Sequence, residues 1–152
     1  MKVSSVSCSD YEPEKVKDRI QKALSPFGGL DNFVDSGDTV LLKPNLLSPK
    51  PPESGIITHP SIVKSMIELL QDIGAEVIVG ESSGGASDDE VGTITARAFK
   101  VSGLEEVCQD TEVEMVNFDN ADYEIVDNPG ETVDTIPLPE KVMEADLVID
   151  LP

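Results

Sequence analysis

Two apolar runs of the chain, residues 39–42 and 76–79, are each followed by polar side chains that could bind or transform a small molecule. These side chains are Lys43, Asn45, Glu81, Ser82 and Ser83. An ammonium group beside an apolar run is costly to bury unless it meets an anion or reaches solvent. Lys43 is therefore the first candidate for holding an anionic ligand. Its structural alternative is an ion pair with a nearby carboxylate.

The other candidates have roles around such a ligand. Asn45, Ser82 and Ser83 could orient the bound molecule, while His59 and Glu81 are available for proton transfer. His59, the only histidine, stands at the expected start of a helix, where the helix dipole lowers its pKa and favours a neutral ring. Both residues also have a structural alternative. His59 could only cap the helix, and Asn45 could only satisfy the hydrogen-bonding groups of the loop that follows it.

The sequence lacks the motif patterns of several well-known binding sites. The glycine-rich stretch 80–85 precedes an expected helix and could hold a phosphate, but it matches neither the Walker spacing nor Gly-x-Gly-x-x-Gly, and a flexible turn explains it equally well. Cys8 and Cys108 are far apart, so the sequence predicts no zinc or iron–sulfur centre and no cofactor held by this chain. No metal site is expected either, although the acids at 88–90 could hold a hard cation loosely.

The charge of the chain excludes whole classes of partner. It has 30 acidic and 11 basic residues, a formal net charge of -19. Nucleic acid and anionic membranes need clustered basic side chains, which are missing here. The acidic surface is either a solvated coat or a docking face for a basic partner. Without an apolar leader or a membrane-length apolar run, the chain is predicted to be cytoplasmic.

Hydrophobic periodicity predicts alternating strands and helices. Strands are expected at 2–7, 39–42, 76–79, 112–118 and 145–150, helices at 12–24, 59–73, 87–98 and 104–108, and a hairpin-like excursion at 119–136 that turns at 128–130. Ser87 and Glu90 have the spacing of a capping box for the third helix. This order predicts an α/β fold, a mostly parallel sheet with helices on both faces.

Ligands of open parallel sheets bind beyond the carboxyl ends of the strands. The sequence offers polar residues at four such ends: Ser7, Cys8, Ser9 and Asp10; Lys43 and Asn45; Glu81, Ser82 and Ser83; and Asp150. They are expected to gather at one edge of the sheet. The alternative is that the strands of any α/β protein end in polar turns.

The length suits a single domain over residues 1–152. Its last expected strand has no following helix to cover it, so the sheet is predicted to be incomplete at the C-terminus and the chain to be the N-terminal part of a longer protein. An unpaired sheet edge would also allow a homodimer.

Three short motifs carry a resemblance to a known family. Lys43-Pro44-Asn45, Thr58-His59-Pro60 and Gly80-Glu81-Ser82, together with the closing run 145–152, resemble the N-terminal half of the domain of unknown function family 362. The resemblance implies that Lys43, Asn45, His59, Glu81 and Ser82 are motif positions. It also implies an association with redox proteins, because many members carry 4Fe-4S clusters in a separate ferredoxin-like segment that this sequence lacks. No reaction follows from it.

Three functional hypotheses remain open. The first is an enzyme-like domain that binds a small anionic molecule at the strand ends. The second is an electron-transfer accessory domain that docks a redox partner protein or a 4Fe-4S module, using its acidic surface for recognition. The third is a structural half-domain without its own activity. The sequence specifies neither substrate nor reaction.

Overall fold

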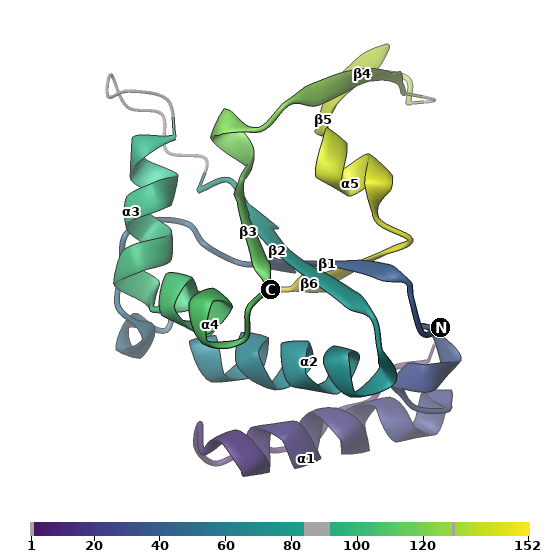
Figure 1. The fold of residues 1–152 in the computed structure, drawn as a ribbon, viewed down its shortest axis with the longest axis vertical. Coiled ribbons are helices and arrows are strands. Elements are labelled where there is room, and N and C mark those ends of the chain that lie inside the picture. The colour runs from purple at the N-terminus through teal and green to yellow at the C-terminus, as the bar shows by residue number, and fades with distance from the viewer. Residues whose placement is uncertain (1, 84–91, 129) are drawn as a thin grey trace.

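The computed structural model describes residues 2–83, 92–128 and 130–152 (Figure 1). Its centre is a four-stranded parallel sheet with the strand order β3-β2-β1-β6. The strands of this sheet are β1 Thr39–Pro44, β2 Glu76–Glu81, β3 Glu114–Asn117 and β6 Leu147–Leu151. A second sheet is an antiparallel pair, β4 Tyr123–Asp127 and β5 Thr135–Pro139.

Helices flank the parallel sheet, as predicted. They are α1 Pro13–Leu24, α2 Pro60–Ile73, α3 Thr93–Ser102, α4 Leu104–Asp110 and α5 Glu140–Glu144. Short 3-10 turns lie at Ser25–Phe27, Leu30–Asn32, Pro52–Ser54 and Phe118–Asn120. The α/β fold is thus confirmed. Within the ranges that the structure describes, no helix is long and apolar enough to cross a bilayer.

The two central strands are buried on both faces. Val40 and Leu42 of β1 belong to the main core together with Val79 of β2, and Val63 and Ile67 of α2 pack into the same cluster. Successive side chains of a strand point to opposite faces, so Leu41 faces away from that cluster, although it too is fully buried. Continuous apolar runs in β1 and β2 are what a parallel strand covered on both faces requires.

Helix α2 begins and ends where the sequence predicts. His59 is its N-cap, Pro60 occupies its first turn, and Gly74 closes it with a φ of 90°. A side chain at position 74 would be strained by this φ, and its Cβ would lie 2.7 Å from Ser36 Oγ. Helix α1 lies alongside α2 (Figure 1) and packs against it as an outer layer.

The predicted first strand, residues 2–7, was wrong, because this segment pairs with no strand in the described part of the chain and Val3 is 81% exposed. Val3 and Val6 are three residues apart, so in an extended chain they point to opposite faces and cannot form one apolar face. Ser7, Cys8, Ser9 and Asp10 therefore do not follow a strand of the sheet. They lead instead into α1, whose N-cap Glu12 accepts a hydrogen bond from the Lys15 backbone N–H at 2.9 Å.

The order of the strands reverses beside β1. The chain passes from β1 through α2 to β2, and through α3 and α4 to β3, and then returns through the β4–β5 pair and α5 to β6 on the other side of β1. In Figure 1 the β4–β5 pair stands apart from the parallel sheet. Such a reversal is where open α/β sheets bind ligands, beyond the carboxyl ends of the strands. The last residues of β1, β2 and β6 are therefore the ones to consider.

Candidate functional site

Lys43 lies at this reversal point and is held between two acids. Its Nζ is 2.7 Å from Glu81 Oε2 and 3.8 Å from Asp150 Oδ1. The three residues come from the ends of three adjacent strands, since β1 pairs with β2 on one side and with β6 on the other. Lys43 thus forms the ion pair with a nearby carboxylate that the sequence offered as the alternative to ligand binding. The Lys43 side chain nevertheless remains 44% exposed, so it is also open to a ligand.

Glu81 depends on this ammonium group. Glu81 is only 7% exposed, and its Oε2 makes no well-aligned hydrogen bond within the described residues. The short contact with Lys43 Nζ is a direct ion pair without hydrogen-bond alignment, so charge attraction is its main source of compensation. Because a buried carboxylate is costly without a nearby cation, the Lys43 ammonium group compensates part of the cost of burying Glu81.

A network of hydroxyl groups surrounds Asp119 beside this ion pair. Ser82 Oγ donates to Asp119 Oδ1 at 2.5 Å, and Thr95 Oγ1 donates to Asp119 Oδ2 at 2.6 Å. Thr95 Oγ1 also accepts from the Ser83 backbone N–H at 2.9 Å and lies 2.7 Å from Ser83 Oγ. Since the single Thr95 proton is directed at Asp119, Ser83 must be the donor in the last contact. The Thr95 hydroxyl therefore makes three hydrogen bonds, with its one proton and both lone pairs used.

These groups form the polar floor of a pocket of about 550 Å³, which we call the Lys43 pocket. It is lined by Lys43, Glu81, Ser82, Phe118, Asp119, Ala121, Tyr123, Ile125, Pro137 and Pro139. The polar side chains come from the ends of β1 and β2 and from Asp119, whereas most of the others come from the β4–β5 pair. The pocket thus has a charged floor and an apolar wall.

Gly80 makes room for one part of this wall. A Cβ at position 80 would lie 2.4 Å from Cζ of Phe118 and 3.2 Å from Cδ1 of Leu41. The Phe118 ring can therefore cover β2 only because position 80 has no side chain. The rest of the predicted glycine-rich loop, including Gly84 and Gly85, lies outside the described residues, as do Ser87 and Glu90 of the predicted capping box.

Asn45 does not line the Lys43 pocket but ties the end of β1 to its neighbours. Its Nδ2 donates to the Ile56 carbonyl at 2.9 Å, and its backbone N–H donates to Thr58 Oγ1 and to the Leu151 carbonyl, at 2.8 and 3.0 Å. Thr58 Oγ1 in turn donates to the same Leu151 carbonyl. Asn45 therefore holds the long loop after β1 against β6.

His59 also lies outside the Lys43 pocket and caps α2. Its Nδ1 accepts from the Ser61 backbone N–H at 3.2 Å, and its ring stacks on Tyr11 with 3.6 Å between the ring centroids. Burial lowers the pKa of His59, while the charge of Glu53 opposes this shift. The capping role that the sequence offered as the alternative is present. The structure does not bring His59 and Glu81 into one pocket.

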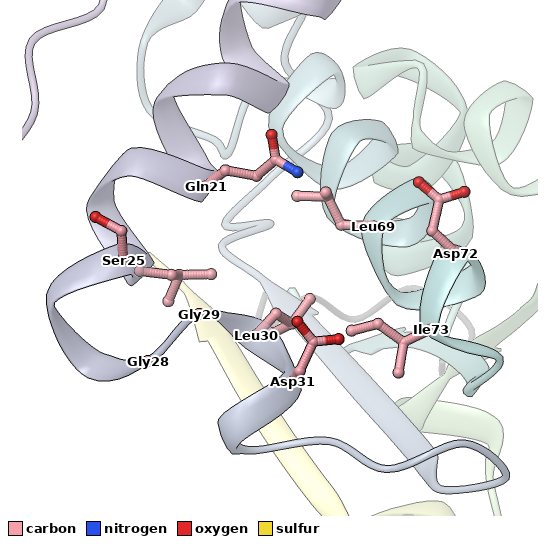
Figure 2. Close-up of a pocket in the computed structure, with 10 residues that line it drawn as sticks. Gln21, Ser25, Gly28, Gly29, Leu30, Asp31, Leu69, Asp72 and Ile73 are labelled. Atoms are coloured by element: carbon pink, nitrogen blue, oxygen red, sulfur yellow. The ribbon is translucent and has the colours of Figure 1, made fainter.

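A second hollow, of about 480 Å³, lies at the other end of the molecule and contains none of the predicted site residues (Figure 2). Figure 2 shows Gln21 of α1 pointing toward Leu69 of α2 at this hollow. Helix α2 starts near the carboxyl ends of the strands and runs toward the amino end of β2, so this hollow lies at the amino edge of the sheet. Open α/β sheets ordinarily bind ligands at the opposite edge.

The two cysteines do not come together. Cys8 is exposed on the segment before α1, whereas Cys108 is buried in α4, and burial raises the pKa of the Cys108 thiol to about 11. In the described ranges, no three side chains of His, Cys, Asp or Glu are grouped so that they could hold a metal ion.

Asp119 and Thr95 were missed as site residues. Sequence reasoning assigned Asp119 to the acidic excursion that follows the strand 112–118, although the rule about carboxyl ends applies to that strand as well. Thr95 lies inside α3, fully buried, and gives no sequence signal because its hydroxyl acquires its role only when α3 packs beside the end of β2.

Comparison with known proteins identifies the family. The sequence profile of the domain of unknown function family DUF362 matches residues 40–152. The thylakoid-associated protein sll1697 of Synechocystis sp. (strain ATCC 27184 / PCC 6803 / Kazusa) is 31% identical over 150 residues, which cover 99% of this chain and 44% of that protein. The chain therefore spans less than half the length of this curated relative. No solved structure matches the chain. The profile match over most of its length shows, as its motifs indicated, that this chain belongs to the DUF362 family.

Proposed function

We propose that this chain binds a small anionic molecule in the Lys43 pocket, as an enzyme-like domain. One observation carries the proposal: a half-exposed ammonium group stands at the reversal point of a parallel sheet and opens into a pocket. Ligands of open α/β sheets bind at such a point. Ser82 also lines the pocket, and because its one proton goes to Asp119, it can orient a donor group of the ligand through the lone pairs of its hydroxyl.

The ion pair with Glu81 does not occupy all of Lys43. An ammonium group has three N–H donors, and the ion pairs with Glu81 and Asp150 do not use all three. The contact with the buried Glu81 fixes the position of Lys43 Nζ, which lowers the entropy cost of meeting a ligand. Glu81 also lines the pocket, whereas His59 does not, so the proposal gives the proton-transfer role to Glu81.

Isothermal titration and thermal shift with phosphate, acetate and benzoate would test this proposal. Anything that binds only the native state raises its apparent stability, so a binding anion should raise Tm. The variant Lys43→Gln should abolish the shift, while it keeps a polar group beside Glu81. Lys17→Gln is the matched control, because Lys17 pairs with Asp72 and Glu68 of α2, away from the pocket.

The two variants decide the outcome. Binding that Lys43→Gln loses and Lys17→Gln keeps supports the proposal. A flat response of the unmodified chain to all the anions, or equal loss in both variants, would refute it. A flat response combined with salt-sensitive association with a 4Fe-4S protein would instead support the electron-transfer accessory hypothesis.

Asp150 supplies a second prediction about the same pocket. Its carboxylate lies 3.8 Å from Lys43 Nζ and is well exposed, so it competes with an incoming anion without being needed by the core. Asp150→Asn removes one negative charge beside the ligand and should tighten anion binding about two- to fivefold at low salt. The gain should shrink at high salt, and weaker binding in this variant would contradict the assigned position of the anion.

A further inference from the structure

We propose that the ligand of the Lys43 pocket carries an apolar, ring-sized body beside its anionic group, and that Tyr123 and Ile125 select this body. The inference rests on the proposed function and adds the chemical class of the ligand: an aryl or branched-alkyl carboxylate or phosphate ester instead of a bare inorganic anion.

One face of the β4–β5 pair lines the pocket. Tyr123 pairs with Pro139, and Ile125 pairs with Pro137, so these four side chains lie on the same face of the two-stranded sheet. All four line the Lys43 pocket. The charged residues of β4, Glu124 and Asp127, are not among its lining residues.

The two pairs form a compact platform. The backbone hydrogen bonds Asn128 N–H to Asp134 O and Glu140 N–H to Asp122 O mark the hydrogen-bonded pairs of this ladder, and these alternate with the non-hydrogen-bonded pairs. Tyr123–Pro139 and Ile125–Pro137 are therefore non-hydrogen-bonded pairs, whose side chains lie closest together.

The platform is exposed although it is apolar. Tyr123 is 63% and Ile125 62% exposed. A contiguous apolar surface that faces a pocket with a charged floor is the usual composition of a small-molecule site, in which a few polar groups fix orientation and apolar groups supply area. The pocket volume of about 550 Å³ also suits a molecule several times larger than phosphate.

The charge balance of the floor leads to the same conclusion. Among the lining residues that the structure describes, Lys43 is the only cation; it is shared between Glu81 and Asp150, while Asp119 adds another carboxylate. A bare anion would gain little net attraction from such a floor. Most of the binding free energy must therefore come from contact of an apolar body with the hairpin platform.

Paired probes test this inference on the intact chain. Phenyl phosphate should bind at least about tenfold more tightly than inorganic phosphate, and benzoate more tightly than acetate, by isothermal titration, since each pair differs mainly in one ring. Tyr123→Ala and Ile125→Ala should each reduce this preference severalfold. Val126→Ala, a similar truncation on the other face of β4, is the matched control and should leave the preference intact. Circular dichroism would verify that each variant is folded.

The outcomes separate the two proposals. Equal binding of phenyl phosphate and inorganic phosphate, both lost in Lys43→Gln, would overturn this inference and leave the anion site standing. A ring preference that survives Tyr123→Ala and Ile125→Ala, or that Val126→Ala loses equally, would also overturn it. If phenol binds as tightly as phenyl phosphate and Lys43→Gln has no effect, the anion site itself fails, and with it this inference.

Discussion

Replacing Thr95 by valine would test whether its hydroxyl is the centre of the network that positions Asp119. Valine has nearly the shape of threonine, so the packing of this fully buried residue is preserved. The change removes the hydrogen bond to Asp119 Oδ2 and both hydrogen bonds from Ser83, and it leaves the Ser83 backbone N–H buried without this partner.

The expected cost follows from these contacts. A hydrogen bond to a charged group contributes about 1.5–3 kcal/mol and one between neutral groups about 1 kcal/mol, and a buried donor without a partner adds a penalty of its own. These terms overlap, so Thr95→Val should lower the free energy of unfolding by about 3 kcal/mol. With a urea m-value of about 2 kcal/mol/M, the unfolding midpoint should fall by about 1.5 M.

Urea unfolding followed by far-UV circular dichroism is the assay, with Thr111→Val as its control. Thr111 Oγ1 donates one hydrogen bond, at 2.7 Å, to the Val107 carbonyl, and both groups are neutral. This control should cost at most about 1 kcal/mol. If Thr95→Val costs no more than Thr111→Val at an unchanged m-value, the Thr95 hydroxyl is not the centre of the network.

Two further predictions concern single side chains. In the native chain an aromatic disulfide reagent at pH 8 should modify Cys8 but not Cys108. Cys108 is buried, and its pKa of about 11 leaves only about one thiol in a thousand ionised at this pH. Modification of both thiols in the native state would contradict the buried position of Cys108. The pKa of His59 is lowered from 6.5 in the folded state, so folding favours the neutral ring. The stability that the neutral ring provides is present above pH 6.5 and is lost as the pH falls toward the folded pKa. The stability of His59→Asn relative to the unmodified chain should therefore rise as the pH falls through this range, and a constant difference between their unfolding free energies would contradict it.

The elements that sequence reasoning predicted well are those whose pattern is unambiguous over many residues. Helix α2 has a cap, a proline in its first turn, a regular apolar stripe and a closing glycine, and all of these agree. The apolar runs of β1 and β2 were predicted by their length and by the turns beside them. Segment 2–7 misled because two valines in a short polar stretch resembled alternation, although their spacing is odd.

For the candidate site, sequence reasoning predicted part of the arrangement of side chains that the structure shows. The rule about carboxyl ends found Lys43 and Glu81, which the structure places in direct contact. It also selected Asn45 and Ser83, whose side chains instead bond to the loop and to Thr95, because chain position shows where a strand ends but not what a side chain contacts. The apolar wall could not be predicted, since the sequence does not specify where the β4–β5 pair folds relative to β1.

The two prolines of β5 also affect how the molecule behaves toward its own copies. In a non-hydrogen-bonded pair the backbone N–H groups point away from the partner strand, so Pro137 and Pro139 occupy the positions whose donors would face outward. Proline has no N–H, so along the outer edge of β5 the Thr135 N–H is the outward donor that remains for strand pairing with another chain. The hairpin can therefore expose apolar side chains on one face, while strand-to-strand association of the kind that leads to aggregation is disfavoured at this edge.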